Sequence, residues 1–110
     1  MSGDREYELV LTPEGARLSG VMRLVSPAAY HGALAEVTAR LSAATSSFEL
    51  DVSGLQFLNS SGITALSRLV MDARARGVPL VFAVDEAVAW QRKTLPSLAK
   101  LYPKITLRKV

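Results

Sequence analysis

The sequence predicts one α/β domain, in which an antiparallel hairpin leads into a mixed, mostly parallel sheet covered by helices. Three observations favour this fold class. Two strand patterns joined by a tight turn open the chain, and strand and helix patterns then alternate to its end. Such alternation builds right-handed parallel crossovers. The 110 residues, 49% of them hydrophobic, contain no linker or internal repeat and suffice for a single core, so residues 1–110 form one domain.

The opening elements are a hairpin and a helix. Residues 6–12 are rich in strand-forming side chains, and residues 12–15 carry the proline and glycine of a type I turn. Residues 16–24 follow as the antiparallel strand. Ser26 precedes a proline and is a good helix cap. A helix over residues 27–43 is predicted from its apolar stripe, which consists of Tyr30, Leu34, Val37 and Leu41.

The middle of the chain is predicted to form a strand, a turn and a long helix. Residues 48–52 predict a short buried strand, and residues 55–58 extend from the following turn toward Asn59. Asn59 is a good N-cap for a helix that runs to about residue 76, and Gly77 ends it as a C-cap.

The last third supplies two strands and a helix. The nearly all-apolar run 79–84 is typical of a strand covered on both faces. Residues 86–90 predict a short helical turn. A separate helix is expected to start around Thr94 and to stop at Pro103, and residues 105–110 alternate as a final strand.

The net charge of +3 is distributed unevenly. Residues 1–91 carry 7 basic and 10 acidic side chains, whereas residues 92–110 carry six basic and no acidic ones. A basic end attracts phosphate, nucleic acid or an acidic protein surface. It is equally typical of a solvated helix and an edge strand on which lysine discourages pairing. No nucleic-acid-binding signature accompanies the basic residues, so nucleic-acid binding is not expected.

Most sequence motifs that are typical of enzymes are absent from this chain. The chain has no cysteine, which excludes disulfides and thiol chemistry. The chain contains the residue types of a catalytic triad in Ser60, His31 and Asp51, but we do not expect them to form one, because no nucleophile elbow surrounds the serine. There is no nucleotide-binding glycine loop and no cluster of metal ligands. We therefore expect neither an enzyme nor a cofactor.

The location is expected to be the cytoplasm. No apolar run approaches the ~20 residues that a membrane span requires. Residues 1–6 also lack the basic and apolar regions of a signal peptide.

The segment 51–63 carries the strongest functional signal. It places Ser60 and Ser61 at the entry to a helix, directly after a buried strand. A phosphate added there meets helix N-terminal amides and brings ~1.5 to 2 negative charges to the surface, which is enough to switch a protein contact. The simpler interpretation is that Asn59 and the two serines only cap the helix.

This segment resembles the signature of the STAS domain, which bacterial anti-sigma factor antagonists and the cytoplasmic domains of sulfate transporters share. Members typically have a strand that ends in Asp, an apolar stretch, and Asp-Ser-Ser/Thr-Gly-Leu opening a helix. Here the corresponding residues are Asp51 and the run Asn59-Ser60-Ser61-Gly62-Ile63. The expected order of elements also fits that fold over the whole chain. The stretch from Trp90 to Pro103 is similar to small stand-alone bacterial STAS-like regulators.

The resemblance implies a partner-switching regulator. In the antagonist family a partner that is both serine kinase and anti-sigma factor phosphorylates the first serine, the unphosphorylated form binds that partner, and a phosphatase resets the system. Carried over, Ser60 is the acceptor and Ser61 the second choice. Asn59, Ser60, Ser61, Gly62 and Arg23 form the partner-binding residues, with Gly62 letting the partner approach closely.

Two of these positions depart from the family pattern. Asn59 stands where the family has Asp, and Arg23 falls where many antagonists have an Asp on the kinase-binding surface. Both changes remove negative charge, which puts recognition by a standard anti-sigma kinase in doubt. The alternative is an adaptor subunit of a larger assembly, such as a transport ATPase complex, that is not phosphorylated. Trp90 would then be its anchor, or else a packed core residue.

Overall fold

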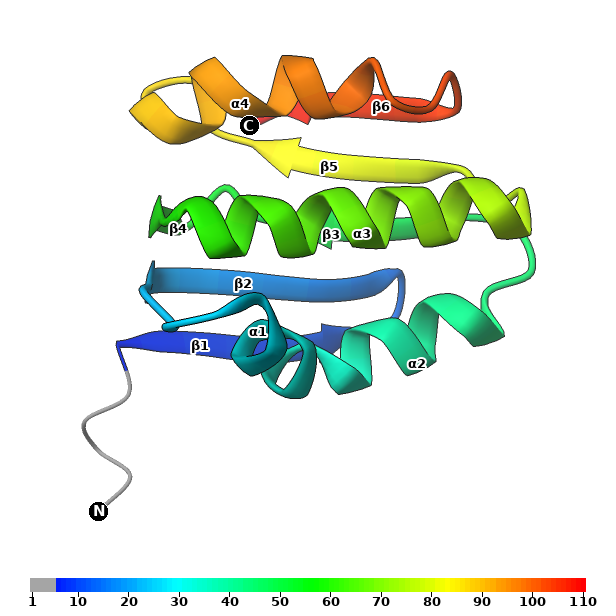
Figure 1. Ribbon diagram of the computed structural model, residues 1–110. Coiled ribbons are helices and arrows are strands. Elements are labelled where there is room, and N and C mark those ends of the chain that lie inside the picture. Colours follow the sequence, from blue (N-terminus) through cyan, green and yellow to red (C-terminus); the bar gives the residue numbers. More distant parts are fainter. Residues whose placement is uncertain (1–5) are drawn as a thin grey trace.

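The computed structural model describes residues 6–110 and has the α/β architecture that the sequence predicts (Figure 1). Residues 1–5, which carry most of the N-terminal segment examined for a signal peptide, lie outside the described part. No helix among residues 6–110 is long and apolar enough to span a membrane. The elements in chain order are β1 (Tyr7–Thr12), β2 (Gly15–Met22), α1 (Pro27–Ala33), α2 (Ala35–Ala43), β3 (Phe48–Asp51), β4 (Leu55–Leu58), α3 (Ser60–Arg76), β5 (Leu80–Val84), α4 (Ala89–Ala99) and β6 (Ile105–Lys109).

The six strands form one mixed sheet in the order β1-β2-β3-β5-β6, with β4 paired to β2. Only β1 and β2 are antiparallel, and the other pairs are parallel. The first part of β2 pairs with β3 and its last part with β4. Residues 55–58, expected only as an extended approach to Asn59, are therefore a strand of their own. They bring the start of α3 beside the end of β2.

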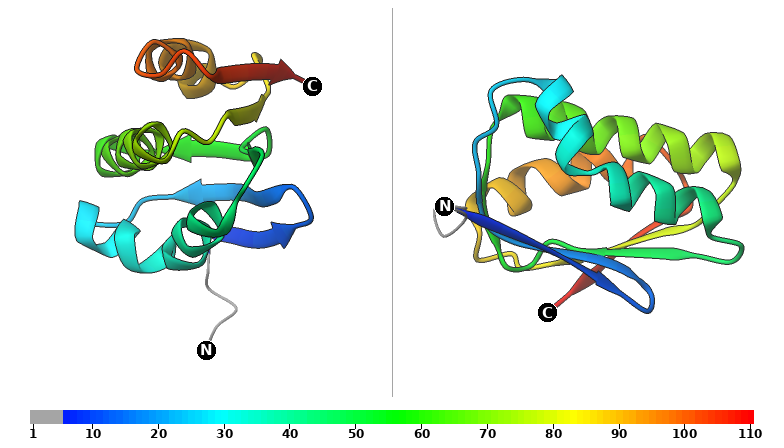
Figure 2. Two further views of the ribbon diagram at one scale, coloured as in Figure 1. Left: turned by 90° about the vertical axis from the view of Figure 1, so that its right-hand side faces the viewer. Right: turned by 90° about the horizontal axis from the view of Figure 1, so that it is seen from below.

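All four helices pack on one face of the sheet (Figure 2). Leu80, Phe82 and Val84 of β5 are buried against this layer. The expectation that β5 is covered on both faces is wrong, because its other face carries no helix among the described residues. Ala83 is nevertheless fully buried on that face. On either side of β5, Glu49 of β3 and Arg108 of β6 form an ion pair 2.6 Å long.

The predicted helix over residues 27–43 is divided into two. Leu34, with φ −100° and ψ 14°, ends α1 and precedes α2. The apolar stripe is confirmed: all four of its residues are buried. The non-helical ψ of Leu34 lets the chain change direction while both halves keep their apolar side chains on the sheet.

The start of the last helix was also predicted incorrectly. α4 begins at Ala89, and Pro96 lies inside it rather than in its first turn. The turn before it is set by Asp85, whose carboxylate accepts a hydrogen bond from the Ala87 amide at 2.9 Å. α4 also ends at Ala99, before the expected stop at Pro103. Two other helix signals are confirmed. The Ser26 hydroxyl accepts from the Ala29 amide at 3.1 Å, and Gly77 closes α3 with a φ of 71°.

Candidate functional site

The candidate site lies where β2 and β4 end and where α1 and α3 begin. Asn59, the cap of α3, is its centre. The side-chain oxygen of Asn59 accepts from the Gly62 amide at 3.0 Å and from the Tyr30 hydroxyl at 2.7 Å. The side-chain nitrogen donates to the Leu24 carbonyl at 2.9 Å. One amide thus ties the start of α3 to α1 and to the segment that leaves β2.

These three bonds explain why an asparagine occupies this position. A carboxylate accepts hydrogen bonds but donates none, so an aspartate would place an oxygen against the Leu24 carbonyl. An amide supplies both the acceptor that Tyr30 needs and the donor that Leu24 needs. The departure from the Asp of the STAS signature is therefore matched to the surrounding hydrogen bonds of this chain.

Tyr30 is the second fixed point of the site. Its side chain is fully buried, and its hydroxyl lies 2.7 Å from the Asn59 oxygen and 3.1 Å from the Met22 carbonyl. Burial raises the pKa of Tyr30 above its ordinary value, because the charged phenolate loses its hydration. The neutral hydroxyl is thus the stable form, and it holds the end of β2 to the cap of α3.

Ser60 and Ser61 differ in accessibility. Ser60 is the first residue of α3 and is exposed, whereas Ser61 is only partly exposed. Neither hydroxyl has a hydrogen-bond partner within residues 6–110. The capping role that the simpler interpretation gave to all three residues therefore belongs to Asn59 alone. Of the two serines, Ser60 offers its hydroxyl to a second protein more openly.

Gly62 has a different role from the one expected. It is buried, and a methyl group at its Cα would lie 2.3 Å from Leu58 Cδ1 and 2.8 Å from the Tyr30 hydroxyl oxygen. Atoms this close overlap, so the position requires glycine for packing within the domain. The expectation that Gly62 lets a partner approach closely is thus wrong, because the space it leaves is filled by Leu58 and Tyr30.

Arg23 lies at the surface just after β2. Its guanidinium group is 5.8 Å from the centre of the Phe57 ring and 3.8 Å from the Glu6 carboxylate, and the pair with Glu6 is largely exposed. Two apolar side chains are exposed in the same region: Val25 at 92% and Phe57 at 43%. We call Arg23, Val25, Phe57 and Ser60 the Ser60 surface. It combines one cation with apolar groups, and the exposed Glu6 carboxylate lies beside it, next to Arg23.

The triad of Ser60, His31 and Asp51 does not assemble. The Asp51 carboxylate accepts hydrogen bonds from the Ser53 amide at 3.0 Å and the Ser53 hydroxyl at 2.7 Å, and so shapes the turn after β3. His31 is exposed on α1, in the helix layer. Within residues 6–110 there is also no group of three or more side chains able to hold a metal ion.

Gln91 is a buried polar residue that the sequence analysis missed. It is 1% exposed, its side-chain oxygen accepts from the Asp85 amide at 2.8 Å, and its nitrogen donates to the carbonyls of Val52 and Leu55 at 2.7 and 3.1 Å. The signal that could have found it is its spacing from Leu95, four residues on, which places a polar side chain on the apolar face of a helix.

Trp90 packs inward. It is only partly exposed, contacts the hydrophobic core and donates from its ring nitrogen to the Leu55 carbonyl at 2.7 Å. Of the two interpretations left open for Trp90, these contacts favour the packed core residue over the anchor for a partner.

The basic C-terminal segment is partly neutralised within the domain. Arg108 pairs with Glu49 at 2.6 Å and Lys109 with Glu86 at 3.3 Å. Arg92 donates to the Glu86 carbonyl at 2.8 Å. Three lysines remain exposed on α4 and the turn after it: Lys93, Lys100 and Lys104. They are spread along the segment and do not form a compact patch in sequence.

Comparison with known proteins adds no family to these observations. No protein-family model matches the chain, and no curated protein is significantly similar to it.

Proposed function

We propose that this chain is a STAS-like protein-binding module that serine phosphorylation regulates, as in the anti-sigma factor antagonists of partner-switching pathways. Ser60 is the acceptor. One observation carries the proposal: an exposed serine hydroxyl, without a hydrogen-bond partner in residues 6–110, stands at the first position of a helix whose cap is already made by Asn59. A kinase reaches this hydroxyl without disturbing the cap.

The surroundings of Ser60 support protein binding. Val25 follows Leu24, which is bonded to Asn59, and Phe57 lies in β4 just before the cap. Both expose apolar area, and such area in a rigid setting favours contact with another protein. The cap is rigid because Asn59 and Tyr30 join three segments through buried or partly buried hydrogen bonds. A phosphate on Ser60 therefore changes the charge of this surface without refolding the domain.

The charge of the Ser60 surface bears on the partner. Arg23 is exposed next to Phe57 and favours an acidic contact on the binding protein, although it also lies 3.8 Å from the exposed Glu6 carboxylate. An arginine in place of the Asp that many antagonists carry distinguishes this surface from that of a typical antagonist. We therefore propose a serine kinase with anti-sigma-like function and a matched phosphatase as partners, with a docking surface on the kinase that is more acidic than usual.

The experiment is a partner capture from native lysate. The baits are the wild type, Ser60→Asp, and the matched control Ser46→Asp, which adds the same charge to an exposed loop before β3, away from α3. We expect the wild type and Ser46→Asp to retain a kinase-like partner that Ser60→Asp loses. Equal recovery by all three baits would make Ser60 only the first residue of a helix and the chain a constitutive adaptor.

The acceptor itself is tested by mass spectrometry of the chain isolated from its native cell. Phosphate is expected on Ser60 and is expected to disappear in Ser60→Ala, which keeps the Asn59 cap and the fold. Phosphate retained on that variant, at Ser61 or elsewhere, would contradict the assignment of Ser60.

A further inference from the structure

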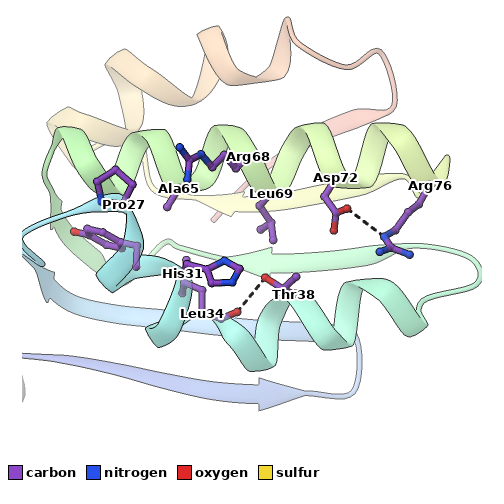
Figure 3. Close-up of a pocket in the computed structure, with 10 residues that line it drawn as sticks. Pro27, His31, Leu34, Thr38, Ala65, Arg68, Leu69, Asp72 and Arg76 are labelled. Atoms are coloured by element: carbon purple, nitrogen blue, oxygen red, sulfur yellow. Dashed lines mark hydrogen bonds and ion pairs between the residues drawn. The ribbon is translucent and has the colours of Figure 1, made fainter.

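A groove of about 330 Å³ lies between α3 and the pair formed by α1 and α2 (Figure 3). Its floor is apolar, with Leu34 and Leu69 buried at the bottom and Ala65 and Pro27 at the sides. The break at Leu34 turns α2 relative to α1. The volume lies at the lower end of the range for small-molecule sites, roughly 300–1,000 Å³.

The rim of the groove carries mostly basic side chains. His31 comes from α1, and Arg68 and Arg76 come from α3. Asp72, the acidic residue of the lining, is engaged by Arg76 at 3.3 Å. Arg68 is exposed and has no ion-pair partner among residues 6–110. One guanidinium at the rim is thus free to pair with an anion.

Asp72 adds an unsatisfied acceptor. Its Oδ1 atom accepts from Arg76, but its Oδ2 atom is buried and has no hydrogen-bond partner in the described part of the chain. In Figure 3 the side chains of Asp72 and Leu69 point from α3 toward α1 and α2, and the His31 ring lies in the gap between them. A buried acceptor without a donor is costly, so a small rotation that turns this carboxylate into the groove, where a bound group donates to it, is favoured.

Arg68 and Asp72 are four residues apart on one helix, so they lie on the same face about one turn apart. The groove therefore offers a cation and an acceptor, on side chains that start about one helical turn apart, above an apolar floor. We propose that it binds a small amphiphilic anion. The apolar body lies on Leu34 and Leu69, a carboxylate pairs with Arg68, and an N–H or O–H group donates to Asp72. This site goes beyond the function proposed above and makes no use of Ser60.

The probe is indole-3-acetate, which joins a flat apolar body, an N–H donor and a carboxylate. Binding is measured by amide ¹H–¹⁵N NMR of the labelled chain. Saturable shifts are expected at the groove residues of α1 and α3. Tryptamine, which has the same body and donor but a cation, is expected to bind about tenfold more weakly or worse. 1-Methylindole-3-acetate, which lacks the donor, is expected to bind several-fold more weakly.

Two variants and a control test the residues. Arg68→Gln is expected to weaken indole-3-acetate by about fivefold to tenfold, with little change for tryptamine. Arg74→Gln removes the same charge from an exposed position of α3 that does not line the groove, and is expected to leave binding unchanged. Ala65→Leu fills the groove and is expected to abolish the shifts.

Each contrary result overturns a defined part of the proposal. The absence of saturable groove shifts at millimolar probe would overturn the site. Equal binding of tryptamine and indole-3-acetate would overturn the selection of anions by Arg68, and equal binding of the methylated probe would overturn the role of Asp72. Because Arg68 is exposed and its variant keeps the fold, these results remain decisive even if Ala65→Leu fails to fold.

Discussion

The same substitution at two helical glycines should change stability in opposite directions. Gly62 lies in the first turn of α3 and Gly32 near the end of α1. A Cβ atom at Gly62 would lie 2.3 Å from Leu58 Cδ1, 2.6 Å from Leu58 Cγ and 2.8 Å from the Tyr30 hydroxyl oxygen. A Cβ atom at Gly32 meets nothing within 4 Å. We predict that Gly62→Ala destabilises the domain and that Gly32→Ala stabilises it.

The magnitudes follow from two competing effects. Alanine is favoured over glycine inside a helix by about 1 kcal/mol. Gly32→Ala should gain this stability in full, because the added methyl group meets no neighbouring atom that would oppose it. Overpacking a filled position costs about 1–3 kcal/mol. At Gly62 both neighbours are buried, Leu58 at 5% exposure and Tyr30 at 0%, so neither moves aside freely. The overpacking cost therefore lies in the upper part of its range, about 2–3 kcal/mol. After the helix preference of about 1 kcal/mol is subtracted, Gly62→Ala should lower the free energy of unfolding by about 1–2 kcal/mol.

The assay is urea unfolding followed by circular dichroism and by the fluorescence of the single tryptophan. Thermal unfolding gives a second reading, in which 1 kcal/mol corresponds to about 4 °C for a domain of this size. Gly32→Ala serves as the matched control for helix propensity. A Gly62→Ala protein as stable as the wild type would refute the packing argument, because it would mean that Leu58 and Tyr30 yield space at no cost.

Three further predictions concern the buried polar groups. Tyr30→Phe should lower the free energy of unfolding by about 1–2 kcal/mol. Because burial raises the pKa of Tyr30, the wild-type stability should be full below about pH 10 and should fall above it. Urea midpoints measured across that pH range should fall less in the variant than in the wild type. Asn59→Asp should lower the free energy of unfolding by about 1 kcal/mol, because it sets a carboxylate against the Leu24 carbonyl. A urea midpoint equal to that of the wild type would argue against the hydrogen bond from the Asn59 side-chain nitrogen to this carbonyl. Gln91→Leu should lower the free energy of unfolding by about 1–3 kcal/mol, because the Asp85 amide loses its acceptor. The carbonyls of Val52 and Leu55 each lose one donor but keep another, from the Leu55 amide and the Trp90 ring. Hydrogen exchange at the Asp85 amide, faster in the variant, checks this directly.

The sequence by itself determined the local signals of the fold. The caps at Ser26 and Asn59 and the left-handed Gly77 lie within three residues of the groups they satisfy, so adjacent residues predict them. The buried stripe of the first helical segment follows from spacing alone. Apart from β4 and the division of the first helix, the order of strands and helices, and hence the α/β class, could be predicted for the same reason.

Tertiary structure decided what distant residues do to one another. Residues 55–58 became a strand through pairing with β2, and Gln91 fixed the start of α4 through carbonyls 36 and 39 residues earlier. The site divides in the same way: the exposed Ser60 was found from its local motif, while Tyr30, 29 residues before Asn59, and the packing role of Gly62 were not. A pattern in sequence encodes which face is buried and where a helix begins. Which buried donor meets which acceptor depends on how the sheet brings separate segments together.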